Sequence, residues 1–324
     1  ATLPQFVEME RRHGSLIRGM RVREVGGQTS EVRESGPNHV PASLARRFSE
    51  DNQYGAGARY GQFVAPRDGM QRLVEALARR LPPTTIRLNA PVEQVQFVGS
   101  PKFDGGWRLR VVGDSTEQYF DRLIVAAPAA VSSRLLNGVD PTLADLVGRI
   151  PYAGCAVALL GIRRDQLVRR IDGFGFVVPA IEKRRIIAGS LASLKFPGRA
   201  PEGKLLLRIF IGGALQPQLV DLSDDEIRRL VLAELSELVG LTGEPEFFDV
   251  ARWRGMMPQY HVGHLDLVRQ IEERAVAIPN LALAGNAYRG VGVPFCIRSG
   301  ELAAERLVAS AERGAGSAER GQTT

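Results

Sequence analysis

The sequence predicts a mixed α/β fold in two parts, and three stretches carry that prediction. Residues 281–284 are a buried apolar run that leads through a Gly-rich turn into an amphipathic stretch beginning near Pro294. A second apolar run, 123–126, turns at Pro128 into another helical pattern. Between 154 and 212, short apolar runs alternate with Arg- and Gly-rich turns, which is typical of an antiparallel sheet. The strand–turn–helix pattern of the first two stretches and the antiparallel pattern of the third indicate two domains.

The composition is that of a soluble globular protein with room for two domains: 324 residues, 44% hydrophobic and 24% charged. The chain has no apolar run of about 18 residues and no signal-peptide pattern. Cys155 and Cys296 stand apart in apolar surroundings, so we expect reduced thiols and a cytoplasmic location. The net charge of +6 fits a solvated surface or affinity for anions, and the absence of a basic block interleaved with aromatics argues against nucleic acid.

The N-terminal region predicts little regular structure. We expect a helix over 4–20 that breaks at Gly14, then a polar surface loop over 21–62. The glycines between Gly55 and Gly61 lack the G-x-G-x-x-G spacing and follow no strand, so we exclude a phosphate-binding loop there.

A helix is expected between Gly69 and Leu81, ended by Pro82 and Pro83. Its apolar face consists of Met70, Leu73, Val74, Leu77 and Leu81. Short strands are expected over 85–88, 92–97, 107–112 and 117–120, the last two as a hairpin.

The middle of the chain predicts strands over 154–162, 174–178, 186–194 and 205–212. An amphipathic helix follows over 224–239, with Ser223 as its N-cap and acidic residues in its first turn. After Arg313 the chain is poor in apolar residues, and we expect disorder.

The turn before Pro294 is the strongest candidate for a site. Gly290 and Gly292 leave no side chains between the backbone and the helix N-terminus, whose N–H groups and partial positive charge favour an anion or an electron-rich ring edge. The simpler interpretation is a packing unit whose glycines only allow a tight turn.

Four segments resemble the protoporphyrinogen/coproporphyrinogen oxidase family, an FAD-dependent branch of the amine-oxidase-like flavoproteins. They are GSLIRG at 14–19, the stretch FVAPRDGMQRL at 63–73 with its continuation to 97, RWRGMMPQYHVGHLDLVR at 252–269, and AGNAYRGVGVPFCIRSGELAAERL at 284–307. The resemblance runs from about Pro4 to Leu307. It implies an FAD-binding domain of the glutathione-reductase/amine-oxidase type that lacks its N-terminal βαβ unit, plus a substrate domain with a largely antiparallel sheet.

This likeness divides the chain into five expected segments. They are a substrate or helical-region segment with a polar loop (1–66), an FAD-domain segment (67–136), the substrate domain (137–252), a C-terminal FAD-domain segment (253–312) and a disordered tail (313–324). The missing unit is expected to carry the dinucleotide fingerprint and the region through which relatives contact a membrane peripherally. A homodimer is also compatible with the resemblance.

By resemblance and position, seven residues are expected to bind FAD: Val95, Trp253, Gly285, Asn286, Val291, Gly292 and Val293. The alternative for Val95 is a plain core valine. Substrate contacts are expected at Pro258, Gln259, Tyr260 and Arg289, although Arg289 also fits a surface salt bridge. His261 and His264 have no third ligand nearby in sequence, so we expect turn and cap hydrogen bonds and no metal.

No side chain shows a catalytic signature, which fits chemistry carried by a flavin. The resemblance implies oxygen-dependent oxidation of a porphyrinogen, protoporphyrinogen IX or coproporphyrinogen III, in haem biosynthesis. A first alternative is another flavin oxidase of this fold that acts on amines or polyenes; Asn286, where amine oxidases often carry Asp, argues against it. A second is a non-catalytic fragment unable to hold FAD, and we expect the chain alone to be inactive.

Overall fold

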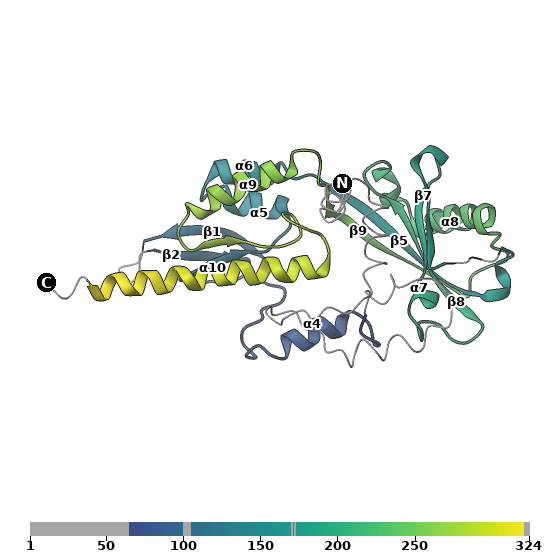
Figure 1. The fold of residues 1–324 in the computed structure, drawn as a ribbon, viewed down its shortest axis with the longest axis horizontal. Helices are drawn as coiled ribbons and strands as arrows, with labels where there is room; N and C mark the ends of the chain where they lie inside the picture. The colour runs from purple at the N-terminus through teal and green to yellow at the C-terminus, as the bar shows by residue number, and fades with distance from the viewer. Residues whose placement is uncertain (1–64, 100–104, 170, 172, 321–324) are drawn as a thin grey trace, which may run out of the picture.

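The computed structural model describes residues 65–99, 105–169, 171 and 173–320. The helix and loop predicted at 4–20 and 21–62 lie outside the described residues. Two lobes stand side by side (Figure 1). We call residues 92–148 with 264–320 the mixed lobe, and residues 152–258 the antiparallel lobe.

The mixed lobe begins with a small antiparallel sheet of β1 (Val92–Val98), β2 (Gly106–Val111) and β3 (Gln118–Phe120), paired in that order. This confirms the strand and hairpin predicted there. The predicted strand at 85–88 is absent: Arg87 instead forms an ion pair with Asp114 of the hairpin turn, at 3.0 Å. A strand needs a neighbour for its backbone groups, and no strand of the described residues pairs with this segment.

A second, two-stranded sheet joins distant parts of the chain. Strand β4 (Leu123–Val125) pairs in parallel with β10 (Leu281–Leu283), Leu281 opposite Leu123. The Ala284 N–H continues the ladder by donating to the Val125 carbonyl at 3.0 Å. The carboxyl ends of both strands therefore emerge at the same edge.

Three helices cover these sheets: α5 (Ala129–Leu136), α6 (Pro141–Gly148) and α9 (His264–Val276). Their apolar faces share one core with the fully buried Trp107, including Leu136, Leu143, Val147, Val268 and Ile271. The carboxylate of Asp140 caps α6 by accepting from the Leu143 N–H and also accepts from Arg274 of α9. Since α6 packs in this core, the change of lobe falls at about 150 and not at the predicted 137.

The antiparallel lobe is a five-stranded sheet in the order β6-β7-β8-β5-β9. Its strands are β5 (Tyr152–Arg163), β6 (Gly175–Val177), β7 (Ile186–Leu191), β8 (Lys204–Gly212) and β9 (Phe247–Pro258). Helix α8 (Asp224–Val239) packs its buried residues on the sheet, and Ser223 and Glu226 form its capping box. The short elements η2 (Arg164–Gln166), η3 (Ala180–Glu182), α7 (Ala192–Lys195) and η4 (Pro217–Asp221) connect the strands.

The predicted antiparallel sheet and helix are confirmed, with two differences. The third strand stops at Leu191, where α7 begins, three residues before the predicted end. Strand β9 crosses the boundary predicted between 252 and 253, because it pairs continuously with β5 from Phe247 to Pro258, apart from one register shift.

Helices α4 (Gln71–Ala78) and α10 (Val293–Arg320) lie on the outside (Figure 1). The helix predicted there is present, but its apolar face is largely exposed: Met70, Val74, Leu77 and Leu81 are 46–58% exposed. In α10, Ala303 and Leu307 are buried where they pack on Ala282 and Ala284 of the β10 segment, whereas Ile297 and Leu302 are 45% and 48% exposed. Helical periodicity identified both helices but could not show what covers them.

Helix α10 continues to Arg320, whereas the sequence predicts disorder after Arg313. Alanine, glutamate and arginine, which favour helix, make up most of 313–320. Among the described residues, none of the helices combines the length and the hydropathy that crossing a bilayer requires.

Candidate cofactor and substrate site

The candidate site lies where β4 and β10 end. In sheets with parallel strands, ligands bind in the crevice outside the carboxyl ends of the strands. The segment after β10, residues 284–292, which we call the β10–α10 turn, lies beside the segment after β4. A Cβ added to Gly285 would come within 3.8 Å of the Ala126 carbonyl oxygen. The structure thus brings two loops together at the edge where a ligand is expected.

The turn is shaped by two glycines and a serine. Gly285 adopts φ +117°, which side-chain-bearing residues rarely adopt, and its N–H donates to Ser299 Oγ of α10 at 3.0 Å. Gly290 is covered by Phe295: a Cβ there would lie 2.6 Å from the ring. Only glycine therefore allows the chain to pass under Phe295 into α10.

The start of α10 presents an apolar rim. Val291, Val293 and Phe295 are 39–48% exposed, and Gly292 lies among them. The first helical hydrogen bond runs from the Cys296 N–H to the Gly292 carbonyl at 3.0 Å. The N–H groups before it have no partner within a helix, so partial positive charge stands beside apolar side chains. In Figure 1 this end of α10 points towards the antiparallel lobe.

The segment after β9 reaches this turn through two side chains. The Tyr260 hydroxyl donates to the Asn286 carbonyl, and its ring stacks on that of His264 with centroids 4.0 Å apart. His264 Nε2 lies 2.8 Å from the Tyr288 carbonyl oxygen. Burial raises the pKa of Tyr260 to about 12, so its hydroxyl remains a donor at neutral pH.

Beneath the turn lies a buried cluster of hydroxyl groups. Tyr288 is 5% exposed, and its hydroxyl has no hydrogen-bond partner among the described residues. Burial raises the pKa of Tyr288 well above its ordinary value. The Tyr152 hydroxyl accepts from the Ala129 N–H at 3.1 Å, at the start of α5.

The other predicted site residues are placed as follows. Trp253 is 56% exposed on β9, opposite Cys155 of β5, and shares an exposed apolar strand end with Met256 and Met257. Pro258 is buried, and the Gln259 N–H donates to the Pro151 carbonyl at 2.8 Å. Val95 on β1 is only 2% exposed, as a core valine would be.

Arg289 forms an ion pair with Glu272 of α9, which favours the salt-bridge interpretation over a substrate contact. Its pKa is raised by the hydrogen bond to Glu272. Across the described ranges, no group of three or more metal-ligating side chains is present. His264 hydrogen-bonds through Nε2 to the Tyr288 carbonyl, which agrees with the hydrogen-bonding role predicted for it.

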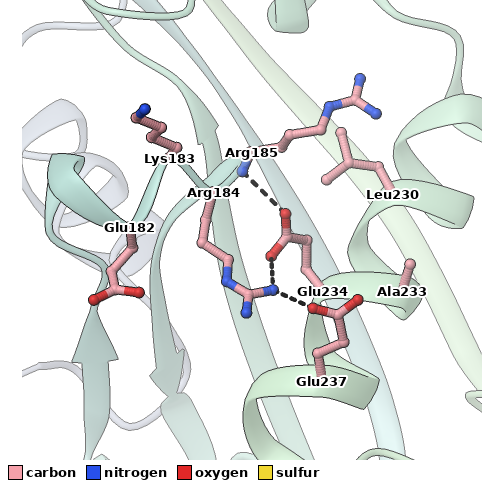
Figure 2. Close-up of a pocket in the computed structure, with 8 residues that line it drawn as sticks. All are labelled: Glu182, Lys183, Arg184, Arg185, Leu230, Ala233, Glu234 and Glu237. Carbon is pink, nitrogen blue, oxygen red and sulfur yellow. Dashed lines mark hydrogen bonds and ion pairs between the residues drawn. The ribbon is translucent and has the colours of Figure 1, made fainter.

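A hollow of about 320 Å³ lies elsewhere, between the start of β7 and α8. Figure 2 shows Arg184 reaching across it to Glu234 and Glu237, and the Arg185 N–H also bonds to Glu234. The hydrogen bonds to these carboxylates raise the pKa of Arg184. The hollow is lined mainly by charged side chains and offers no apolar platform for a ring, so it is a joint between sheet and helix rather than the cofactor site.

The family model described as "Flavin containing amine oxidoreductase" matches residues 12–308. The chain belongs to this family. The amine-oxidase-like flavoprotein class and the FAD cofactor predicted from the sequence are thereby confirmed. The β10–α10 turn has glycines, an apolar rim and a helix start that fit an isoalloxazine ring.

Several similar proteins are named for a more specific activity than the family model is. A coproporphyrinogen III oxidase from Bacillus subtilis is 31% identical over 94% of this chain and 58% of its own length. A mitochondrial protoporphyrinogen oxidase from Nicotiana tabacum is 26% identical over 96% of this chain and 61% of its own. A solved structure from Exiguobacterium sp. 255-15, assigned to the protoporphyrinogen oxidases, aligns with TM-score 0.67 and 28% identity over 91% of this chain and 56% of that one. The chain thus spans about three fifths of the length of these relatives.

Sequence reasoning did not identify Ser299 or the carbonyl partners of Tyr260 and His264. The spacing of four between Tyr260 and His264 was visible, but their partners lie 24–26 residues further along the chain. Ser299 is one of several small residues in an amphipathic helix, and nothing in the pattern marks it as the partner of Gly285.

Proposed function

We propose that this chain takes part in FAD-dependent oxidation of a porphyrinogen to a porphyrin in haem biosynthesis. The observation that carries the proposal is the direct contact between the segment 258–264 and the β10–α10 turn. These are the two stretches in which the chain most resembles porphyrinogen oxidases, and the fold joins them at the carboxyl ends of β4 and β10.

Residues of the turn would hold the flavin. Val291, Gly292 and Val293 would lie against the pyrimidine side of the ring, and Gly285 and Asn286 near the ribityl and phosphate arm. When bound, the flavin accepts the hydrogens removed from the substrate and delivers them to oxygen. The positive end of α10 would stabilise negative charge on the reduced ring, an effect that is worth about 2–4 kcal/mol for a well-aimed donor.

The exposed apolar end of β9 suits a large, flat tetrapyrrole. Trp253 and the buried Pro258 flank Met256 and Met257, which are 48% and 45% exposed, and the strand leads directly to Gln259 and Tyr260. These side chains would exclude water from the ring system. The propionates need cationic partners; Arg289 is one candidate, although its pairing with Glu272 must then be exchanged for the substrate.

Within this proposal, either coproporphyrinogen III or protoporphyrinogen IX is the substrate. Two alternatives to the proposal also stay open: an amine or polyene as substrate, and a chain that holds no FAD. Peripheral membrane contact, a cytoplasmic location and a homodimer also stay predictions.

A flavin titration with a matched pair of variants tests the site. Val291→Glu would place a carboxylate on the apolar rim, whereas Val177→Glu places one at a 78% exposed position on β6. Val291→Glu is expected to weaken FAD binding at least about tenfold, because it brings an unpaired charge against the ring. Visible absorbance of bound flavin provides the measurement. Failure of the wild-type chain to bind FAD, or equal binding by both variants, would contradict the assignment.

The substrate is tested on the full-length protein, because the chain alone is expected to be inactive. Each porphyrinogen is offered with FAD and oxygen, and putrescine serves as an amine control. Porphyrin fluorescence is expected from at least one porphyrinogen and only when FAD is present. Hydrogen peroxide from the amine without any porphyrin would favour the amine alternative.

A further inference from the structure

The stacked side chains Tyr260 and His264 hold two carbonyl groups of one short turn. Asn286 and Tyr288, which supply these carbonyls, are two residues apart. A backbone carbonyl can only accept, so Nε2 of His264 must carry a proton and donate to Tyr288. The two hydrogen bonds fix the peptide planes that follow Asn286 and Tyr288.

Each member of the pair is anchored in a different lobe. His264 is the first residue of α9, whose Val268 and Ile271 are fully buried in the core of the mixed lobe. Tyr260 follows β9, whose last residue, Pro258, pairs with Tyr152 of β5 in the antiparallel lobe. The stacked pair therefore connects the two lobes: a displacement of one lobe relative to the other would move one of the two rings.

We propose that Tyr260 and His264 are a positioning pair that presets the β10–α10 turn for the flavin and aligns the antiparallel lobe with it. This inference rests on the proposed function, because it assumes that the turn receives the ring. Ordering a mobile backbone on binding opposes association, so a turn that is fixed beforehand binds more tightly. Neither side chain touches the reacting atoms in this role; both act through the main chain of the turn.

The chain offers variants that separate the hydrogen bonds from the packing. Tyr260→Phe keeps the ring and removes the donor. His264→Gln keeps an amide N–H near the position of Nε2, whereas the shorter amide of His264→Asn does not reach it. Tyr119→Phe, on the 65% exposed Tyr119 of β3, and His261→Asn, on an exposed residue, are the matched controls.

Two readouts are made on the full chain. In the flavin-free protein, hydrogen–deuterium exchange of peptides covering 284–297 is expected to accelerate about three- to tenfold in Tyr260→Phe and His264→Asn, as loss of one hydrogen bond implies. It should stay at the wild-type rate in His264→Gln and in both controls. Exchange in the core of the antiparallel lobe should not change in any variant.

In the second readout, FAD affinity is expected to fall roughly tenfold in Tyr260→Phe and His264→Asn, with a shifted reduction potential of the bound flavin and recovery of both in His264→Gln. Unchanged turn exchange in Tyr260→Phe and His264→Asn, equal behaviour of the two His264 variants, or acceleration across the whole chain would overturn the inference. If the wild-type chain binds no FAD, the proposed function fails, while the exchange experiment still decides whether the pair holds the turn.

Discussion

The two lobes treat apolar side chains in opposite ways. In the antiparallel lobe, the sheet and α8 enclose a core of residues such as Leu160, Ile209 and Leu235, all fully buried. Apart from Trp253, Met256 and Met257 at the end of β9, its exposed large hydrophobics, such as Val177 and Ile181, are scattered. On α4 and at the start of α10, exposed apolar residues lie close together in the chain, from Met70 to Leu81 and from Val291 to Leu302. Scattered exposure is normal, whereas contiguous apolar surface marks a binding site.

The lobes also differ in the candidate binding regions that they contain. The hollow of the antiparallel lobe is spanned by the ion pairs of Arg184. The β10–α10 turn offers glycines, a helix start and apolar side chains. We therefore base the proposed site on the uncovered apolar surface at the end of the parallel sheet and not on the geometric hollow.

The sharpest test of this contrast replaces one apolar residue of each kind. Ile209→Ala creates a cavity in a closed core and is expected to lower the free energy of unfolding by about 2–5 kcal/mol. Leu77→Ala, at a 54% exposed position on α4, should change it by less than about 0.5 kcal/mol. Denaturant unfolding measures both. Similar losses from the two variants would show that α4 is covered and that the contrast is wrong.

A smaller loss in the free energy of unfolding is expected from substitutions of Asp140, which joins α6 to α9 in the mixed lobe. Burial acts to raise the pKa of this carboxyl, but hydrogen bonds from the Leu143 N–H and Arg274 outweigh it, so the pKa is lowered. Asp140→Ala removes the cap and should cost about 1 kcal/mol or somewhat more, whereas Asp140→Asn keeps an acceptor for the cap and loses the ion pair.

The difference in stability between the wild type and Asp140→Asn should depend on pH with a defined sign. A carboxyl with a lowered pKa in the folded state stabilises the fold above its unfolded pKa, which is about 3.9, and loses that contribution as the pH falls through the folded pKa. The stability gap between the wild type and Asp140→Asn should therefore be full at neutral pH and shrink in acid. A gap that widens below pH 4 would contradict this account of the joint.

Ser223 provides the corresponding test in the antiparallel lobe. Its hydroxyl accepts from the Glu226 N–H, and the Glu226 carboxylate accepts from the Ser223 N–H. Ser223→Ala should lower stability by about 1 kcal/mol, while Ser223→Asp should retain most of it, as measured by thermal unfolding. Equal losses would mean that capping does not contribute to this helix.

The smallest effect is expected from Arg289→Ala. Arg289 and Glu272 are both more than 40% exposed, and exposed ion pairs contribute about 0–1 kcal/mol. Little change in stability together with a raised KM for a porphyrinogen would indicate a substrate contact. Unchanged KM would leave Arg289 as a surface salt bridge.

Much of the fold follows from local pattern. Helix α8 spans the predicted residues, with Ser223 and the acidic first turn at its start, because caps and periodicity act within a few residues. The β2–β3 hairpin is predicted for the same reason. Strand β9 was not predicted: its end reads RWRGMMP, without alternation, and it is a strand because β5 supplies its partners.

The candidate site also has a part that local sequence pattern predicts and a part that it does not. The glycines of the turn and the start of α10 are visible in the sequence, and the resemblance adds their relation to a flavin. The supports of the turn, Tyr260, His264 and Ser299, depend on contacts between segments 14–26 residues apart, which no local pattern encodes. The exposure of α4 likewise depends on what packs against it, which periodicity cannot show.

The central claim is that the β10–α10 turn receives the flavin ring. Hydrogen–deuterium exchange of the full chain with and without FAD tests it most directly. FAD is expected to slow exchange in peptides covering 284–297 and to leave peptides around the charged hollow, 182–187 and 230–237, unchanged. Protection of the charged hollow instead, or no protection of the turn at FAD concentrations that give bound-flavin absorbance, would contradict the claim.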